Sequence, residues 1–486
     1  MTITLNKICK YLENEVSITN DIQISEVFVD SRKVTQNSLF VALHGEKTDG
    51  HSYVASAIEN GAIAILAEES YRQKLEASLP EELKKKSHII YTDDTLAAMG
   101  VIAKGLLCDM PTGKPIKVAV TGSVGKTTTK EMIACCLSAG GKTHKTQGNR
   151  NSEIGFPMTI YEMPEDSDYA VCEMGMRGLG QVKYLTEIYK PHIAVVTNIG
   201  IAHIELLGTQ ENILKAKLEI AIGMKNSPES VLLLNGDDNL LSDKNLVMQI
   251  LKEYNADNIS IKYFGTAGHC DYQIADTKTD GKEQSFTLKY VDKGSIVEKK
   301  VTLAVPGVHN LMNAAVSLAC AHIGGADVDK ARGLLADFGK DDAIRQRIIT
   351  TPAGYLIDDA YNAGPESMKA SLSVLAGLDA DVRIAALADM LELGDFSQKA
   401  HEEVGQAASF CADILVAHGR LAEYYTKTFQ GRSFMTDELE DTVNIIKELI
   451  VHYANQNKKV AILVKGSNSM KMNTVATALQ DYMNNK

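Results

Sequence analysis

One stretch of this chain, residues 116–130, constrains its fold more than any other. It reads Ile-Lys-Val-Ala-Val-Thr-Gly-Ser-Val-Gly-Lys-Thr-Thr-Thr-Lys, so a β-branched segment runs into a glycine loop and then into a helix-forming segment. Backbone N–H groups of such a loop surround phosphates, and the N-terminus of the following helix favours their negative charge. The general pattern has glycine where this chain has Val120, and an ordinary strand–turn–helix is the alternative interpretation. The Gly-Lys-Thr that follows the strand favours a phosphate loop.

The predicted phosphate loop indicates that the chain binds a nucleoside triphosphate. Lys126 can reach the β- and γ-phosphates, and the Thr127 hydroxyl can bind Mg²⁺. The chain lacks the Asn-Lys-x-Asp motif of GTPases and the Leu-Ser-Gly-Gly-Gln signature of ABC-type ATPases. We predict that the triphosphate is bound by Gly122, Ser123, Val124, Gly125, Lys126, Thr127 and Thr128.

Composition restricts the classes of protein to which the chain can belong. Its 486 residues exceed what one hydrophobic core usually supports, so two or three domains are expected. A net charge of −12 argues against a general nucleic-acid or membrane-surface role. The eight cysteines are scattered without a Cys-x-x-Cys pair, which favours reduced thiols. No signal-peptide pattern and no membrane-spanning apolar run is found, so we expect a cytoplasmic protein.

The pattern of apolar runs predicts three α/β domains, at residues 1–112, 113–325 and 326–486. In the first, strands are predicted at 38–43 and 62–67, with a helix at 53–60 between them. The third repeats a doubly wound, Rossmann-like alternation of strands and helices, with strands predicted at 355–357, 383–387, 414–417 and 460–464.

The middle domain is predicted to contain a parallel sheet with helices on both faces. Besides the phosphate-loop strand, its continuous apolar runs lie at 169–172, 193–197 and 231–234, and a helix is expected at 310–323. The alternation of strands and helices stops at the apolar runs 259–264, 285–290 and 299–305. Turn residues separate these runs, which predicts antiparallel hairpins.

Two polar residues end consecutive strands of the predicted middle sheet. Glu173 ends the run at 169–172, and His203 follows the run at 193–197 after a loop that contains glycine. Ligands bind at this edge of a parallel sheet, and a carboxylate there can bind Mg²⁺ directly or through water. A solvent-facing glutamate and a structural histidine are the alternatives. Lys217, taken alone, has the pattern of a surface helix lysine.

The order and spacing of several short motifs resemble the Mur ligase family, the ATP-dependent amide-forming enzymes of peptidoglycan precursor synthesis. The resemblance covers nearly the whole chain. Besides the phosphate loop, the matching motifs are Asp30-Ser31-Arg32, Asp49-Gly50-His51, Gly148-Asn149-Arg150-Asn151, Glu173-Met174-Gly175, Thr197-Asn198-Ile199-Gly200, Ala216-Lys217, Gly307-Val308-His309-Asn310, Asp358-Asp359-Ala360-Tyr361-Asn362-Ala363, Asp389-Met390-Leu391-Glu392-Leu393-Gly394 and Lys465-Gly466-Ser467.

The resemblance implies ATP and two Mg²⁺ ions as cofactors. Lys126 and Thr127 would hold ATP and Mg²⁺, while Glu173 and His203 would be metal ligands. Lys217 would be carbamylated by CO₂ and help to orient the second Mg²⁺, because a carbamate offers the oxygen ligands that this metal prefers. Lys126, His203 and Lys217 would form the catalytic set.

Further residues receive binding roles from the same resemblance. Asn310 and Asn313 would contact adenine, and Arg345 and Asp359 would bring the third domain to the nucleotide. The positions that match substrate-binding residues of the family are Ser31, Arg32, Asn149, Asn151, Asn362, Lys465 and Ser467.

The implied reaction joins D-alanyl-D-alanine to UDP-N-acetylmuramoyl-tripeptide. ATP would phosphorylate the terminal carboxylate of the tripeptide, whose third residue is diaminopimelate or lysine, and the dipeptide amine would displace the phosphate. The first domain would bind the uridine nucleotide, and the enzyme would be a monomer, as is usual in the family.

Several other enzyme classes share parts of this pattern. The ligase that adds diaminopimelate carries Asp-Asn-Pro-Arg in its third domain, which this chain lacks; the lysine-adding ligase is a related alternative. Folylpolyglutamate synthase lacks a uridine-binding first domain, and a non-catalytic regulator would have lost Lys126, Glu173 or His203. Departures from the family pattern leave the identity of the incoming amine open, since three of the four lie in the third domain: Ser152, Gly364, Ala388 and Asn468.

Overall fold

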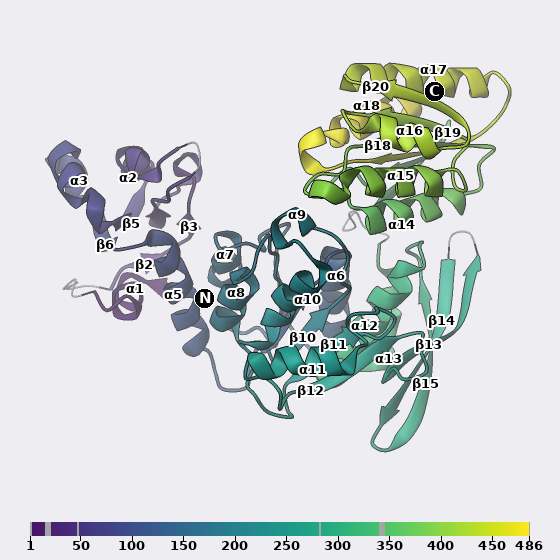
Figure 1. Cartoon of the computed structure of the whole chain (residues 1–486). Coiled ribbons are helices and arrows are strands. Elements are labelled where there is room, and N and C mark those ends of the chain that lie inside the picture. Colours follow the sequence, from purple (N-terminus) through teal and green to yellow (C-terminus); the bar gives the residue numbers. More distant parts are fainter. Residues whose placement is uncertain (1, 15–20, 46–47, 281–282, 340–345, 486) are drawn as a thin grey trace.

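The computed structural model describes residues 2–14, 21–45, 48–280, 283–339 and 346–485. Figure 1 shows three α/β domains arranged along the chain, as predicted for the fold class. Among the described residues, no helix is long and apolar enough to cross a membrane.

The N-terminal domain is built on a four-stranded parallel sheet. Its strands, in sheet order, are β3 (Val27–Phe28), β4 (Ser38–Val41), β5 (Ala62–Glu68) and β6 (His88–Thr92). The predicted strands at 38–43 and 62–67 and the helix at 53–60, which is α2 (Val54–Glu59), are confirmed. The remaining elements of this domain are β1 (Ile3–Thr4), α1 (Leu5–Tyr11), β2 (Gln23–Ile24), α3 (Arg72–Ser78), α4 (Glu81–Lys84) and α5 (Thr95–Cys108).

The middle domain contains a nine-stranded sheet in the order β15-β14-β13-β12-β11-β10-β7-β9-β8. At its centre the strands pair in parallel and are buried on both faces, which explains their continuous apolar sequences. Val118 and Val120 belong to the apolar cluster on one face of the sheet, while Ala119 belongs to the cluster on the opposite face. The central elements are β7 (Ile116–Thr121), α6 (Lys126–Leu137), β8 (Thr143–Lys145), α7 (Gly155–Tyr161), β9 (Tyr169–Glu173), α8 (Gln181–Tyr189), β10 (Ile193–Val196), α9 (Ile204–Leu207), α10 (Gln210–Leu218) and β11 (Val231–Asn235).

The antiparallel part of this sheet begins later than predicted. Strand β12 (Ser260–Gly265) follows α11 (Lys244–Glu253) and pairs in parallel with β11, so the prediction of an antiparallel hairpin at 259–264 was wrong. The helix between β11 and β12 makes a crossover that returns the chain in the same direction. The antiparallel strands are β13 (Tyr272–Asp280), which was not predicted, β14 (Glu283–Asp292) and β15 (Ser295–Leu303).

Helix α12 (His309–Ile323) follows the antiparallel strands and is itself followed by α13 (Val328–Asp337). Helix α13 buries Ala331 and Leu335 in the same apolar cluster as α6 and α12. We therefore propose that the third domain begins after α13 and not at the predicted boundary of 325.

The C-terminal domain contains a six-stranded sheet that is parallel except at one edge, where β16 pairs antiparallel with β17. In sheet order the strands are β16 (Arg347–Thr351), β17 (Gly354–Asp358), β21 (Val460–Lys465), β18 (Val382–Ala388), β19 (Ile414–His418) and β20 (Arg432–Thr436). The four predicted strands are confirmed, whereas β16 and β20 were missed because edge strands need no apolar run. The helices are α14 (Pro365–Ala376), α15 (Ser397–Ala408), α16 (Ala422–Thr428), α17 (Leu439–Ala454) and α18 (Met472–Asn484).

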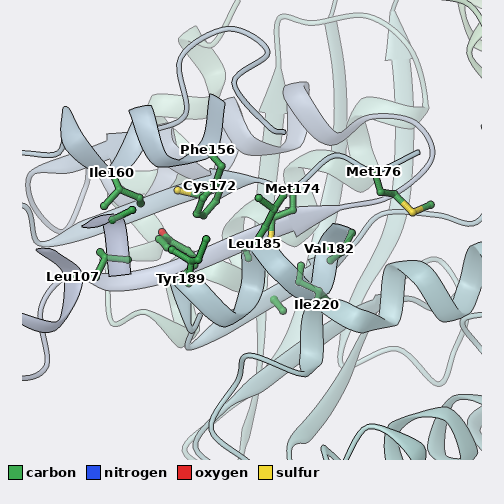
Figure 2. Packing of buried hydrophobic residues seen from close by; sticks show 14 of the residues in the cluster. Leu107, Phe156, Ile160, Cys172, Met174, Met176, Val182, Leu185, Tyr189 and Ile220 are labelled. Atoms are coloured by element: carbon green, nitrogen blue, oxygen red, sulfur yellow. The ribbon is translucent and has the colours of Figure 1, made fainter. Parts of the chain in front are cut away.

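One apolar cluster joins the N-terminal and middle domains. Helix α5 contributes Leu107, α7 contributes Phe156, and α8 contributes Leu185 and Tyr189 (Figure 2). The Tyr161 hydroxyl also donates to the backbone oxygen of Met99 on α5, at 2.7 Å. These two domains are therefore held together by a shared core.

The C-terminal domain has separate cores on the two faces of its sheet. Among the described residues, Ile201, which is partly buried, is the only apolar side chain of the middle domain packed against either of them. Attachment of this domain to the rest of the molecule is correspondingly slight, which is the usual condition for domain movement.

Phe156 tests the shared core. The ring is fully buried and lies edge-on to Tyr189, with the ring centroids 5.6 Å apart. We expect Phe156→Ala to lower the free energy of unfolding by about 3–5 kcal/mol, through lost apolar burial and the cavity left behind. The measurement is the midpoint of urea unfolding followed by circular dichroism.

Phe410→Ala is the matched control, because this side chain is 82% exposed. Equal midpoints for the two variants would contradict the assignment of Phe156 to the shared core.

Candidate active site

The phosphate loop connects β7 to α6, and two glycines give it its shape. Gly125 has a φ of 84° and Gly122 a φ of 148°, which are conformations that other residues rarely adopt. A Cβ atom at Gly122 would lie 1.9 Å from the Thr197 hydroxyl oxygen. The loop can therefore approach β10 this closely only with glycine at position 122.

Side chains that follow β10 hold the loop in place. The Asn198 amide oxygen accepts from the Val124 N–H at 2.9 Å, and its amide nitrogen donates to the Val124 carbonyl at 3.1 Å. The Thr197 hydroxyl donates to the same carbonyl at 2.7 Å, and the Ser123 hydroxyl accepts from the Gly200 N–H at 2.9 Å. No role was predicted for Thr197 or Asn198 from the sequence, although their position directly after a parallel strand could have indicated that they lie at the site.

The Lys126 side chain folds over the loop. Its ammonium donates to the carbonyl oxygens of Gly122 and Ser123, at 2.8 and 3.2 Å. Lys126 and the loop residues from Ser123 to Thr128 line one wall of a cavity of about 350 Å³. The ammonium is thus next to the space in which phosphates would bind.

Glu173 lies beside the phosphate loop at the end of β9 and is 1% exposed. One carboxylate oxygen accepts from the Thr127 hydroxyl at 2.8 Å, and the other accepts from the Asn151 amide at 2.7 Å. The Glu173 N–H donates to the Thr146 hydroxyl at 3.1 Å. Among the residues that the structure describes, no lysine, arginine or histidine forms an ion pair with Glu173. A buried carboxylate and a hydroxyl are a donor set that suits a hard divalent cation.

His203 and Lys217 approach the same region from the next segments of the chain. His203 precedes α9 with a φ of 63°, and its Nδ1 lies 2.5 Å from Oε2 of Glu392 in the C-terminal domain. Burial lowers the pKa of His203, the Glu392 carboxylate opposes this shift, and the neighbouring Lys126 ammonium adds to it.

Lys217 is 1% exposed, although sequence analysis alone had favoured a surface position. Within the described parts of the chain, its side chain forms no hydrogen bond or ion pair. Burial lowers the pKa of Lys217 well below the usual value, and the nearby Lys126 charge adds to the effect.

Of the two residues predicted to contact adenine, Asn313 lines the cavity and Asn310 does not. Asn313 lines the cavity, and its amide oxygen accepts from the Thr129 hydroxyl at 3.0 Å. Asn310 is buried behind it, accepts from the Asn313 amide at 3.0 Å and donates to the Pro306 carbonyl at 2.7 Å. Asn310 is therefore placed to orient Asn313.

The C-terminal domain supplies the opposite wall of the cavity. Lys465 forms a 2.7 Å ion pair with Asp359 and donates to the Asn362 carbonyl at 2.9 Å. All three residues line the cavity. Ser467 instead accepts from the Leu391 N–H at 3.0 Å and supports the loop at 389–394. Arg345 lies outside the described residues.

The remaining predicted substrate residues lie outside this cavity. Ser31 is buried in the N-terminal domain, while Arg32 is exposed and forms two 2.9 Å hydrogen bonds to Asp30. These bonds lower the pKa of Asp30 to about 2. Asn149 is exposed in the turn before Asn151. The structure thus places the described residues that were predicted to bind ATP and metal in one region, and separates them from Ser31 and Arg32.

Asn198 tests the support of the phosphate loop. Asn198→Ala removes both side-chain bonds to Val124. Because lost hydrogen bonds at a part-buried site cost about 1–3 kcal/mol, we expect ADP binding to weaken about tenfold or more. Titration calorimetry with ADP is the measurement.

Asn239→Ala serves as the control, because Asn239 is exposed. Unchanged ADP affinity in Asn198→Ala would show that the loop keeps its shape without this side chain.

Comparison with known proteins places the chain among enzymes of one kind. The sequence profile of the Mur ligase middle domain matches residues 120–321. The profiles of the Mur ligase family catalytic domain and of the Mur ligase glutamate ligase domain match residues 23–106 and 344–468.

Similar proteins cover almost the full length. UDP-N-acetylmuramoyl-tripeptide–D-alanyl-D-alanine ligase of Bacillus subtilis is 37% identical over 465 residues, which are 94% of this chain and 93% of the relative. The crystal structure of MurF from Acinetobacter baumannii aligns with a TM-score of 0.85 at 26% identity and 99% coverage of both chains. The MurF ligase of Thermotoga maritima in complex with ADP aligns with a TM-score of 0.77 at 25% identity, covering 95% of this chain and 98% of that chain.

Proposed function

The chain belongs to the Mur ligase family, and we propose that its cavity is the site where D-alanyl-D-alanine is joined to UDP-N-acetylmuramoyl-tripeptide with ATP hydrolysis. The chain is an ATP-dependent ligase of the MurF type in peptidoglycan precursor synthesis. The observation that carries the site assignment is the buried Glu173 carboxylate, hydrogen-bonded to Thr127 beside Lys126 and Lys217.

The nucleotide end of the cavity follows from the phosphate loop. Loop N–H groups and the N-terminus of α6 would bind the phosphates, and the Lys126 ammonium would exchange its two carbonyl partners for phosphate oxygens. Asn313, which lies on α12 and contacts Thr129 of α6, would contact the base, with Asn310 fixing its amide. The ADP complex of the similar Thermotoga maritima protein supports nucleotide binding.

The donor set fits Mg²⁺. Thr127 and Glu173 would hold one ion, while His203 and Lys217, the latter as its carbamate, would hold a second. Bound Mg²⁺ would offset the repulsion between the triphosphate and the tripeptide carboxylate, which must come into contact. Lys217 is suited to carbamylation because its amine is buried and unpaired among the described residues, and because burial lowers its pKa.

The order of chemical steps follows from the two substrates. The tripeptide carboxylate attacks the γ-phosphate of ATP, and ADP leaves. The dipeptide amine then attacks the acyl carbon, and phosphate leaves as the amide forms. Docking of the C-terminal domain, with Asp359, Asn362 and Lys465 in the cavity wall, would keep water from the acyl phosphate.

Substrate recognition is proposed from the resemblance. Ser31 and Arg32 would contact the uridine nucleotide, Asn149 and Asn151 the peptide, and Asn362, Lys465 and Ser467 the incoming dipeptide. The cytoplasmic location and the monomeric state remain predictions.

A phosphate-release assay tests the proposed reaction. Purified protein with ATP and Mg²⁺ should release phosphate only when UDP-N-acetylmuramoyl-tripeptide and D-alanyl-D-alanine are both present. Equal release with D-alanyl-D-lactate, or no release with either acceptor, would contradict it. Lys126→Met is the control and should lower turnover on the order of 100-fold or more, because Lys126 stabilises developing phosphate charge.

Lys217→Ala tests the carbamate. The variant should lose activity and recover part of it when formate or acetate is added, because a small carboxylate replaces the missing oxygen ligands. Lys215→Ala, which alters a more exposed lysine on the same helix, is the matched control. Full activity of unrescued Lys217→Ala would remove the carbamate from the mechanism.

A further inference from the structure

A close polar contact between the middle and C-terminal domains joins His203 to Glu392. The imidazole Nδ1 lies 2.5 Å from carboxylate Oε2. Both residues have a φ of 63°, a left-handed conformation that costs about 1–3 kcal/mol for residues other than glycine. Such conformations persist where the surrounding structure requires them, and here two of them face each other across a domain boundary.

The loop that carries Glu392 is held firmly within its own domain. The Asp389 carboxylate accepts from the N–H groups of Arg420 and Leu421, and the Met390 N–H donates to His401. The Leu391 N–H donates to the buried Ser467 hydroxyl. These hydrogen bonds fix the loop to the C-terminal domain, so Glu392 moves together with that domain.

In the middle domain, helix α9 contacts this loop. A Cβ atom at Gly394 would lie 3.3 Å from the Glu205 backbone, so the two segments are in close contact. The second Glu392 oxygen lies 3.9 Å from Nε of Arg177 in the middle domain. Figure 1 shows α9 at the edge of the middle domain that faces the C-terminal domain.

The contact determines which nitrogen of His203 is free. A carboxylate accepts hydrogen bonds, so Nδ1 carries the proton and donates it to Glu392. The lone pair then lies on Nε2, which is the arrangement found where a histidine binds a metal and a carboxylate holds its other nitrogen. The Lys126 charge acts on the imidazole, and Lys126 lines the cavity where we propose that phosphates bind.

We propose that Glu392 is a positioning residue, which fixes the orientation and tautomer of His203 and completes the metal site only when the C-terminal domain is docked. This inference rests on the proposed function of His203 as a metal ligand. Because coupling between two equilibria is reciprocal, metal binding at His203 also favours docking. The domain that contributes to the amine site thereby controls the metal site of the ATP half-reaction.

Mn²⁺ binding, measured by electron paramagnetic resonance without nucleotide or substrates, tests the proposal. We expect Glu392→Gln to weaken the His203-dependent component of Mn²⁺ binding by about 10- to 100-fold, the usual effect of removing the carboxylate behind a metal-binding histidine. Glu392→Asp, which keeps the charge, should have an intermediate affinity. Asp395→Asn removes an exposed carboxylate from the same loop and should leave Mn²⁺ binding unchanged.

His203→Ala separates the two hypotheses. If His203→Ala weakens Mn²⁺ binding and Glu392→Gln does not, the positioning role is overturned and the ligand assignment stands. If His203→Ala binds Mn²⁺ as the wild type does, both are overturned. Thermal unfolding checks the fold of each variant, and Glu392→Asn is the second variant because asparagine tolerates a left-handed backbone.

Discussion

The parallel pairing of β7 with β9 on one side and with β10 on the other determines where the chemistry of this chain takes place. Ala119 lies opposite both Cys172 and Ala194, so the three strands end at the same edge of the sheet. The phosphate loop, Glu173 and the Thr197–His203 segment leave the sheet there. Residues far apart in the sequence therefore meet without any long loop having to fold back.

The two outer domains are attached by different kinds of contact. A continuous apolar cluster fixes the N-terminal domain to the middle one, whereas Ile201 and a few polar contacts hold the C-terminal domain. Apolar burial over a large area resists separation, while isolated polar contacts exchange readily with water. The N-terminal domain, for which we propose uridine-nucleotide binding, is thus fixed to the middle domain. The C-terminal domain, for which we propose binding of the amine substrate, is attached more weakly.

Sequence analysis predicted the elements whose apolar runs reflect burial, including all the central parallel strands. It missed β8, β16 and β20, whose edge positions require no such run, and it also missed β13. It mistook the direction of β12, because direction depends on the preceding helix and not on local composition. At the site, Glu173 and His203 were predicted from their positions at strand ends. The burial of Lys217 and the contact of Asn198 with Val124 depend on tertiary packing that no local pattern records.

The folded-back position of Lys126 affects how tightly the phosphate loop would hold a nucleotide. In the structure, the ammonium that we propose for the phosphates donates to the carbonyl oxygens of Gly122 and Ser123. If nucleotide binds as proposed, phosphate oxygens and loop carbonyls compete for the same ammonium. Part of the interaction with the phosphates would then be offset by the loss of these internal hydrogen bonds, which would form again as ADP leaves.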